Sequence, residues 1–231
     1  PHGDPEKIRQ HVRTAERYIE KWGQVSPLIA TAFFPHSLYT CTPGTLKEIK
    51  QVARQAQIPF MTHLSETREE VTLIKERYGR TPIRHLEALG VLDNRTVAVH
   101  CNWPDEEEIR ILAEHRVPVA HNPESGMKLA SGLAPVPKLH AAGIVVGLGT
   151  DGSASNNDLD IFGEMGSAAR IHKLTAMDPT VMDARTVLKM ATIDGARVLG
   201  LEEEIGSIEA GKMADMILLD MDKPRLTPLY N

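Results

Sequence analysis

Apolar residues along the chain recur at two different spacings. Across residues 8–22 and 42–57 they return every three or four positions, which is the spacing of one face of an α-helix. Short apolar runs of strand length lie between the helical segments, and they cover residues 28–36, 58–63, 96–101, 117–122 and 144–151. Because strands that alternate with helices pair in parallel through crossover connections, the pattern predicts an α/β fold with a parallel sheet.

Further segments with helical spacing continue this alternation towards the end of the chain. We expect helices over residues 67–79, 81–92, 104–115, 136–143, about 158–174 and about 183–200. Each of the last four strands is therefore preceded by at least one helix, as the crossover connections of a parallel sheet require.

Polar side chains stand where the five apolar runs end. The residues are His36, His63, His100, His121 and Asp151, and they lie about 29 residues apart on average, close to the roughly 31 residues per unit of a (β/α)8 barrel. The spacing favours such a barrel, and a doubly wound sheet stays open as the alternative. In both folds the carboxyl ends of parallel strands meet at one edge, where catalytic residues gather.

Side chains alternate between the two faces of a strand, so the strand ends also predict side-chain directions. If His100 points to the barrel axis, Ala98 points the same way, and Val97 and Val99 face the helices. A small inward residue below a polar strand end leaves room for a site at the mouth of the barrel.

The residue types at the strand ends indicate metal chemistry. Imidazole and carboxylate groups bind zinc at about 2.0–2.2 Å. A single histidine at a strand end is more often structural, whereas several in one layer favour a metal site. In the stretch THLSE (62–66), Glu66 follows His63 by three residues, and a glutamate there can move a proton to or from metal-activated water. The alternative is that Glu66 caps the helix beginning near Thr67.

Composition narrows the class of protein. The chain has 231 residues, 42% apolar and 25% charged, and a net charge of −5. Charges of both signs are interspersed, so we expect neither a nucleic acid nor an anionic membrane surface as partner. With Cys41 and Cys101 alone there is no disulfide framework, which favours the cytoplasm. No apolar run reaches about 18 residues, and the first ten residues do not resemble a signal peptide.

Several stretches together are similar to the amidohydrolase superfamily, and within it to the 5-methylthioadenosine/S-adenosylhomocysteine deaminases and related aminohydrolases. They are PHSLYTC (35–41), FMTHLSET (60–67), VAVHC (97–101), HNPESGMKLASG (121–132), GLGTDGSASNNDLDIFGEM (147–165) and GSIEAGKMADMILLD (206–220). The likeness covers nearly the whole chain. It implies about the last five β/α units of a (β/α)8 barrel over residues 1–200, and the start of a small β-sandwich over residues 201–231.

The resemblance also implies a role for each strand-end residue. His63 matches a metal ligand, and Asp151 matches a second ligand that accepts a proton from the attacking water. Glu66 matches the acid/base that protonates the purine ring, and both carboxylates would contact substrate. His100 matches the residue that orients the water, and His36 matches a substrate-contacting histidine.

Other parts of the pattern are structural or depart from the family. Residues 121–132 match a loop that lines the pocket, with His121 itself in a structural or supporting place. Gly126 stands where relatives commonly carry Asn, so the contacts of this loop are expected to differ. The family's His-x-His pair, which supplies two more metal ligands, is missing, because no two of the ten histidines are two residues apart.

The implied reaction is hydrolytic deamination of an adenine nucleoside thioether, with Zn²⁺ as the expected cofactor and Fe²⁺ or Mn²⁺ as alternatives. The expected partners are a purine nucleoside and water, and homo-oligomerisation stays open. The alternative activities are a guanine or cytosine-type deaminase and a triazine hydrolase. A truncated half-barrel without catalysis is the alternative outside the enzyme class.

Overall fold

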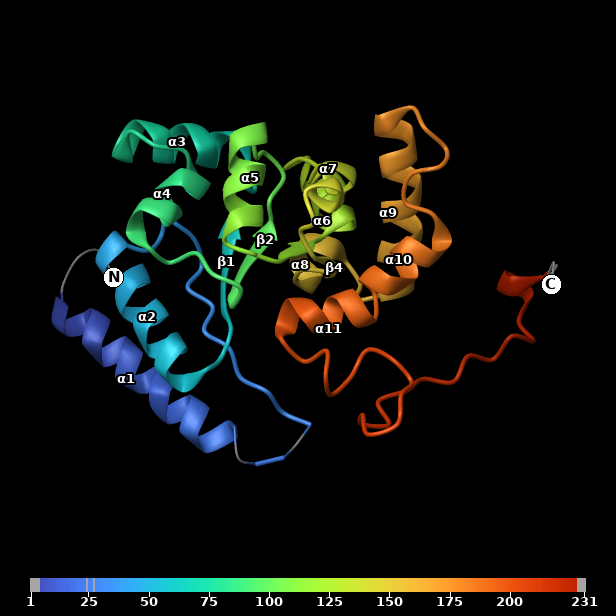
Figure 1. Ribbon diagram of the computed structural model, residues 1–231, viewed down its shortest axis with the longest axis horizontal. Coiled ribbons are helices and arrows are strands. Elements are labelled where there is room, and N and C mark those ends of the chain that lie inside the picture. The colour runs from blue at the N-terminus through green and yellow to red at the C-terminus, as the bar shows by residue number, and fades with distance from the viewer. Residues whose placement is uncertain (1–4, 24, 27, 228–231) are drawn as a thin grey trace.

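A parallel sheet lies at the centre of the molecule. The computed structural model describes residues 5–23, 25–26 and 28–227. Within them, four strands pair in parallel in the order β1–β2–β3–β4 (Figure 1). Their bounds are β1 Phe60–Leu64, β2 Thr96–His100, β3 Val119–His121 and β4 Val146–Leu148. The predicted α/β fold with a parallel sheet is confirmed.

Helices precede the sheet, connect its strands and follow it (Figure 1). The bounds of those before β4 are α1 Pro5–Trp22, α2 Pro43–Ala56, α3 Arg68–Tyr78, α4 Pro82–Leu89, α5 Glu106–Glu114, α6 Pro123–Leu129 and α7 Val136–Ala141. After β4 come α8 Ser153–Asn156, α9 Ile161–Ala176, α10 Ala184–Met190, α11 Ile193–Leu199 and the short 3₁₀ helix η1 Pro224–Leu226. Most predicted helices therefore form within a few residues of their expected bounds.

Local sequence signals explain where the helices around the site begin and end. The Thr67 hydroxyl accepts the backbone N–H of Glu70 in the first turn of α3, and Asp105 and Glu108 form a reciprocal capping box at the start of α5. Gly79 and Gly90 end α3 and α4 in the left-handed conformation that glycine adopts without steric cost.

The two faces of the sheet carry different apolar residues. Phe60, Ala98 and Val146 belong to the main core, which packs the sheet against the helices. Val97 and Val99 lie on the opposite face in a smaller cluster. The predicted side-chain directions along β2 are therefore wrong, since Ala98 belongs to the main core with most of the helices, and the two valines pack on the other face with Val198 of α11. The alternation fails as a guide to His100 because that residue has a φ of 71° and leaves the strand's pleat.

The predicted strand over residues 28–36 does not form a regular strand. Phe33 and Ser37 make isolated parallel bridges to β1, and Pro35 lies between them. Because proline has no N–H to donate, it interrupts a ladder and is tolerated at sheet edges. This segment therefore follows β1 as an irregular edge.

The single helix predicted over residues 183–200 is wrong, because α10 and α11 are separate helices with a break at Thr192. The Thr192 hydroxyl donates to the carbonyl oxygen of Leu188, a bond that competes with helix continuation. A Cβ on Gly147 of β4 would lie 3.0 Å from the Cα of Gly195 in α11. The break thus lets α11 cross β4 at close contact.

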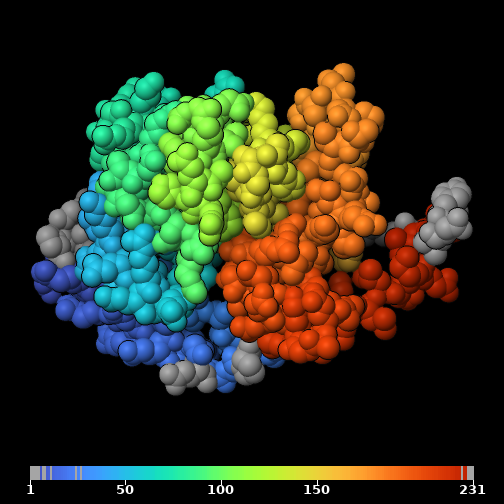
Figure 2. All heavy atoms as spheres, viewed as in Figure 1, coloured from blue at the N-terminus to red at the C-terminus, as the bar shows by residue number. Residues whose placement is uncertain are grey.

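Beyond α11 the chain first folds back against that helix, where a Cβ on Gly206 would lie 2.7 Å from the Cβ of Ala196. Its last described part then extends away from the sheet and helices (Figures 1 and 2). Residues 201–227 contain η1 and no strand among the residues that the structure describes. The division into a barrel part, 1–200, and a return segment, 201–231, stays a prediction. None of the described helices is both long enough and apolar enough to cross a membrane.

Candidate active site

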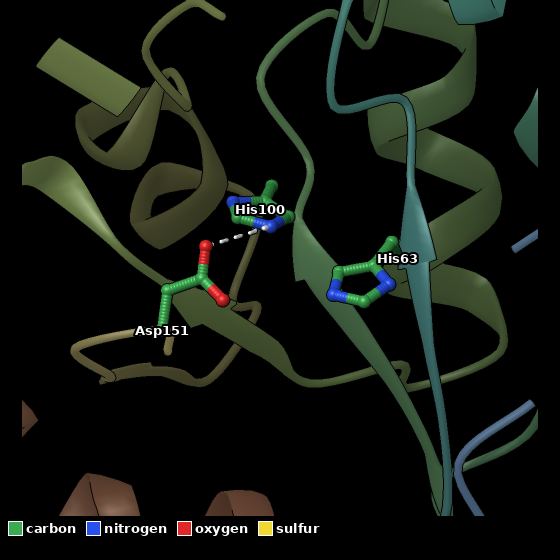
Figure 3. Close-up of side chains that lie close together, drawn as sticks. All are labelled: His63, His100 and Asp151. Carbon is green, nitrogen blue, oxygen red and sulfur yellow. Dashed lines mark ion pairs between the residues drawn. The ribbon is translucent and has the colours of Figure 1, made fainter. Parts of the chain in front are cut away.

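Three of the predicted strand-end residues converge at the carboxyl edge of the sheet. Ligand atoms of His63, His100 and Asp151 lie within 4.8 Å of one another, and they are the one such group of three found among the described residues. Figure 3 shows the two imidazole rings and the carboxylate turned towards a shared space beyond the strand ends. Ring centroids of His63 and His100 are 5.4 Å apart with nearly parallel planes.

Left-handed backbone conformations bring these groups together. The φ angles are 51° at Ser65, 71° at His100 and 62° at Asp151, each just past the end of a strand or at its last residue. Non-glycine residues adopt positive φ rarely, and such conformations cluster at functional sites. The chain therefore turns sharply at the ends of β1, β2 and β4, next to the polar side chains that meet at the mouth of the sheet.

The ring of His63 is oriented by the irregular edge segment. Its Nδ1–H donates to the backbone carbonyl oxygen of His36 at 2.7 Å, and its backbone N–H donates to the same oxygen at 3.1 Å. Because a carbonyl can only accept, the proton lies on Nδ1, which leaves a lone pair on Nε2. This is the arrangement in which a histidine ligates a metal through one nitrogen and is held through the other.

His100 is buried between two carboxylates. Its Nε2 lies 3.8 Å from Glu66 Oε1 and 3.9 Å from Asp151 Oδ2, and it has no hydrogen-bond partner within the described structure. On the other side of the ring, the side-chain amide of Asn122 lies 3.4 Å from Nδ1. Burial lowers the pKa of His100, with the carboxylates of Glu66 and Asp151 opposing this shift.

Asp151 is held by two hydrogen bonds. The Ser125 hydroxyl donates to Oδ2 at 2.7 Å, and the backbone N–H of Gly152 donates to Oδ1 at 2.8 Å. Burial alone would raise the pKa of Asp151, but these bonds and the nearby histidines hold it below its usual value. The group is therefore an ionised carboxylate with a fixed direction.

Glu66 lies in the turn between β1 and α3. Its backbone carbonyl accepts from the side-chain amide of Asn102 at 2.9 Å, and its carboxylate faces His100. The cap of α3 is the Thr67 hydroxyl, which accepts from the N–H of Glu70 at 3.0 Å. The alternative that Glu66 serves as the cap of this helix is therefore wrong, because a threonine does so.

His36 and His121 lie outside the three-residue cluster. The exposed ring of His36 stands beside His63, with centroids 4.8 Å apart. His121 is buried, and its Nε2 lies 3.0 Å from Nε2 of His172 in α9. Burial, and then the neighbouring histidines, hold the pKa of His121 well below its usual value.

The segment 121–132 contains α6 and is not a continuous loop. Pro123 occupies the first turn of this helix, where its missing N–H costs nothing. A Cβ on Gly126 would lie 2.5 Å from the carbonyl oxygen of Gly132, so the chain here has no space for a side chain. The departure from Asn at this position therefore matches a close approach of two backbone segments.

Two supporting residues were missed by the sequence interpretation. Ser125 fixes Asp151, and Glu70 accepts the backbone N–H groups of Ser65 and Glu66. Glu70 carries a usable signal, because Thr67 followed three residues later by a glutamate has the spacing of a capping box. Ser125 has no such signal, since its partner is 26 residues away.

Comparisons with known proteins agree with this architecture. A family model described as the amidohydrolase family matches residues 3–231. The chain is 49% identical over 231 residues to a 5-methylthioadenosine/S-adenosylhomocysteine deaminase of Syntrophobacter fumaroxidans, which covers 100% of this chain and 52% of that protein. It is 45% identical over 230 residues to a 5'-deoxyadenosine deaminase of Methanothermobacter thermautotrophicus, covering 99% of this chain and 53% of that protein.

The structural comparison gives the same result. A crystal structure of an adenosine deaminase from Xanthomonas campestris with bound zinc matches with a TM-score of 0.90 and 42% identity, over 95% of this chain and 50% of that one. The chain spans about half the length of the curated relatives it matches. The predicted partial barrel is confirmed by this match. From its motifs, its parallel sheet and its full-length match to the family model, the chain belongs to the amidohydrolase family.

Proposed function

We propose that the protein carrying this sequence is a metal-dependent aminohydrolase that releases ammonia from an adenine nucleoside, with 5'-methylthioadenosine and S-adenosylhomocysteine as the expected substrates. The observation that carries this proposal is the convergence of His63, His100 and Asp151, with Glu66 3.8 Å from His100. The names of the relatives, which specify deaminases of adenosine derivatives, support the substrate class.

The donor set fits a divalent cation. His63 has its Nδ1 hydrogen-bonded and its Nε2 available, and the carboxylate of Asp151 is ionised and fixed. His100 Nε2 is a buried nitrogen without a hydrogen-bond partner, which is costly unless a ligand or water satisfies it. We assign His63 and Asp151 as ligands. Zn²⁺ is the expected metal, with Fe²⁺ and Mn²⁺ as alternatives. In the family, two further ligands are expected from a His-x-His pair, which the full-length protein would have to provide.

The metal would act as a Lewis acid and lower the pKa of a coordinated water towards about 7. The other steps fall to side chains of this chain. His100, between the two carboxylates, orients the attacking water, and Asp151 accepts a proton from it. Glu66 donates a proton to the ring nitrogen next to the carbon that bears the amino group. As water adds to that carbon, the proton that Asp151 accepted passes to the amino group, the C–N bond breaks and ammonia leaves. The proton of the remaining hydroxyl returns to Glu66 as the ring carbonyl forms.

His36 is assigned to substrate contact. Its ring is exposed beside His63 and makes hydrogen-bond contacts from Nδ1 to Ser37 at 3.0 Å and Thr40 at 3.2 Å. Because both contacts are made by Nδ1, Nε2 stays available to a substrate. His36→Ala should therefore raise the Michaelis constant more than it lowers turnover.

The test is an ammonia-release assay on the full-length polypeptide that carries this sequence, loaded with Zn²⁺. The panel compares 5'-methylthioadenosine, S-adenosylhomocysteine, 5'-deoxyadenosine, guanine, cytosine and a chlorinated triazine. We expect the adenine nucleosides to have the highest kcat/KM and a chelator to abolish activity. A higher kcat/KM for guanine, cytosine or the triazine would reject the substrate class, and a protein that binds no metal would support the non-catalytic alternative.

A further inference from the structure

A buried carboxylate lies behind the turn that carries Glu66. Glu70 is 4% exposed, and it is not among the residues to which the family resemblance assigns a role. Its Oε1 accepts the backbone N–H of Ser65 at 3.2 Å, and its Oε2 accepts the backbone N–H of Glu66 at 2.7 Å. The two oxygens thus hold two successive backbone amides of the turn.

The same turn is held from its other side. The carbonyl oxygen of Ser65 accepts from the backbone N–H of Asn102 at 3.0 Å, and the carbonyl oxygen of Glu66 accepts from the Asn102 side chain at 2.9 Å. Ser65 has a φ of 51°, a conformation that costs energy for a residue with a side chain. Glu70 and Asn102 together maintain this conformation, and it sets the direction in which the Glu66 side chain leaves the backbone.

An ordinary helix cap does not need this arrangement. Glu108 occupies the same N3 position in α5, is also buried, and accepts from the N–H of its own cap residue, Asp105, at 3.0 Å. Glu70 also interacts with the backbone N–H of its cap residue Thr67, and beyond that it reaches back to the turn that carries Glu66. The two glutamates share a helix position, and Glu70 differs in that it also holds the two backbone amides of the preceding turn.

We propose that Glu70 is a positioning residue that holds the Ser65–Glu66 turn so that the Glu66 carboxyl reaches the substrate ring nitrogen beside His100. This inference rests on the proposed function, because it gives Glu66 its role as proton donor. Glu70 does not touch the reacting atoms, and it acts through the backbone of the turn.

The ionised form of Glu70 is the form that can accept both N–H groups. Burial raises the pKa of Glu70 from 4.5 to about 7, although the backbone N–H groups lower it. The titratable groups facing it are the carboxylate of Glu66, the phenol of Tyr39 and the thiol of Cys101. The fold therefore keeps an acceptor for the turn at a place where burial disfavours its charge.

The test is steady-state kinetics of Glu70→Gln and Glu70→Ala in the full-length polypeptide, with metal content measured for each. A displaced reacting group can cost about 100-fold in rate, so we expect kcat to fall about 10-fold in Glu70→Gln and up to about 100-fold in Glu70→Ala. KM should stay within about twofold, since the ground-state contacts are unchanged. Glu108→Gln is the matched control, and its kcat should equal that of the wild type below its melting temperature.

A double-mutant cycle separates positioning from general destabilisation. If Glu70 acts through Glu66, Glu70→Gln should not lower kcat further in a Glu66→Gln background. An equal loss of kcat in both backgrounds would overturn the proposal, as would a wild-type kcat in folded, metal-loaded Glu70→Gln.

Amide hydrogen exchange gives a reading that does not depend on activity. The backbone amides of Ser65 and Glu66 should exchange faster in Glu70→Gln than in the wild type, and Glu108→Gln should leave them unchanged. Unchanged exchange in Glu70→Gln would overturn the positioning role. An inactive wild-type enzyme would instead reject the proposed function and leave the exchange result to decide whether Glu70 holds the turn.

Discussion

The two carboxylate residues of the site, Glu66 and Asp151, are held in different ways. We call each of them, together with the groups that hold it, a corner of the site. Glu66 stands in a turn whose amides are held by Glu70, four residues further along the same segment. Asp151 is held at its side chain by Ser125 of α6, which is 26 residues away in sequence. A local bond thus fixes the proposed proton donor through its backbone, and a long-range bond fixes the proposed metal ligand through its carboxylate.

The buried carboxyl group of Glu164 supports the backbone segments next to Asp151 and Ser125. The side-chain amide of Asn156 donates to the carbonyl oxygen of Thr150 at 2.8 Å and to Glu164 Oε1 at 2.5 Å. Glu164 Oε2 accepts the backbone N–H of Glu124 at 3.1 Å, next to Ser125 in α6. The corner therefore depends on packing between α6, α8 and α9. The difference teaches that one proposed catalytic group can be secured within a single β/α unit, while the other needs three helices in place.

The largest expected effect comes from removing the carboxyl group of Glu66, which is the proposed proton donor. Glu66→Gln keeps the shape of the side chain and loses its titrating proton, so turnover should fall by about 10²–10⁴, the usual contribution of general acid–base catalysis. Metal content should stay at the wild-type level, because Glu66 is not a proposed ligand. Parallel kinetics and metal analysis would check this, and unchanged turnover would remove Glu66 from the mechanism.

At the other corner, Asp151→Asn should affect the metal first. The change removes the charge of a proposed ligand and keeps its size, so metal affinity should fall by more than the roughly 10–100-fold typical of residues that support ligands. Competition with a chromogenic chelator would measure the affinity. Full metal retention together with normal kcat would contradict the assignment of Asp151.

A milder change at the same corner tests the long-range support. Ser125→Ala removes the hydroxyl that donates to Asp151 Oδ2, so the carboxylate loses part of its fixed direction. Metal affinity should fall by about 10–100-fold while the fold is retained. Ser153→Ala, at an exposed serine in α8, is the control and should bind metal as the wild type does. Equal affinities for Ser125→Ala and the control would show that this support is not needed.

The smallest expected effect concerns stability at the Asp151 corner. Burial raises the pKa of Glu164 from 4.5 to about 7, so the folded protein binds this proton more tightly than the unfolded chain. The resulting stability is present below about pH 4.5 and is lost as the pH rises through about 7. Glutamine does not titrate, so Glu164→Gln does not lose this stability as the pH rises. The unfolding free energy of the variant relative to wild type should therefore rise by about 1–3 kcal/mol between pH 4.5 and 8.

Urea titrations at several pH values would measure this difference. Glu203→Gln, at an exposed glutamate in the segment after α11, serves as the control and should leave the pH dependence of the unfolding free energy unchanged. A pH-independent difference between Glu164→Gln and wild type would show that Glu164 titrates alike in the folded and unfolded states.

The sequence predicted the fold class and the meeting of His63, His100 and Asp151, because strand order and strand ends follow from apolar runs and from the residues that terminate them. It misplaced the faces of β2, since a positive φ at His100 leaves no trace in an apolar-polar pattern. The sequence interpretation also predicted a regular strand that includes Pro35 and one continuous helix that includes Thr192. Both predictions are wrong, because these single residues interrupt the regular backbone hydrogen bonding. Contacts between distant helices, such as that of Ser125, arise only in the folded chain.

The left-handed backbone at His100 and Asp151 has a consequence for how such a site can diverge. Asp, Asn and His are among the few residues with side chains that accept this conformation readily, and β-branched residues do not. The set of amino acids that these two positions tolerate is therefore narrowed by local geometry before any chemical selection acts. A descendant that exchanged one cation for another would have to draw on this short set of residues, or first rebuild the turn beneath them.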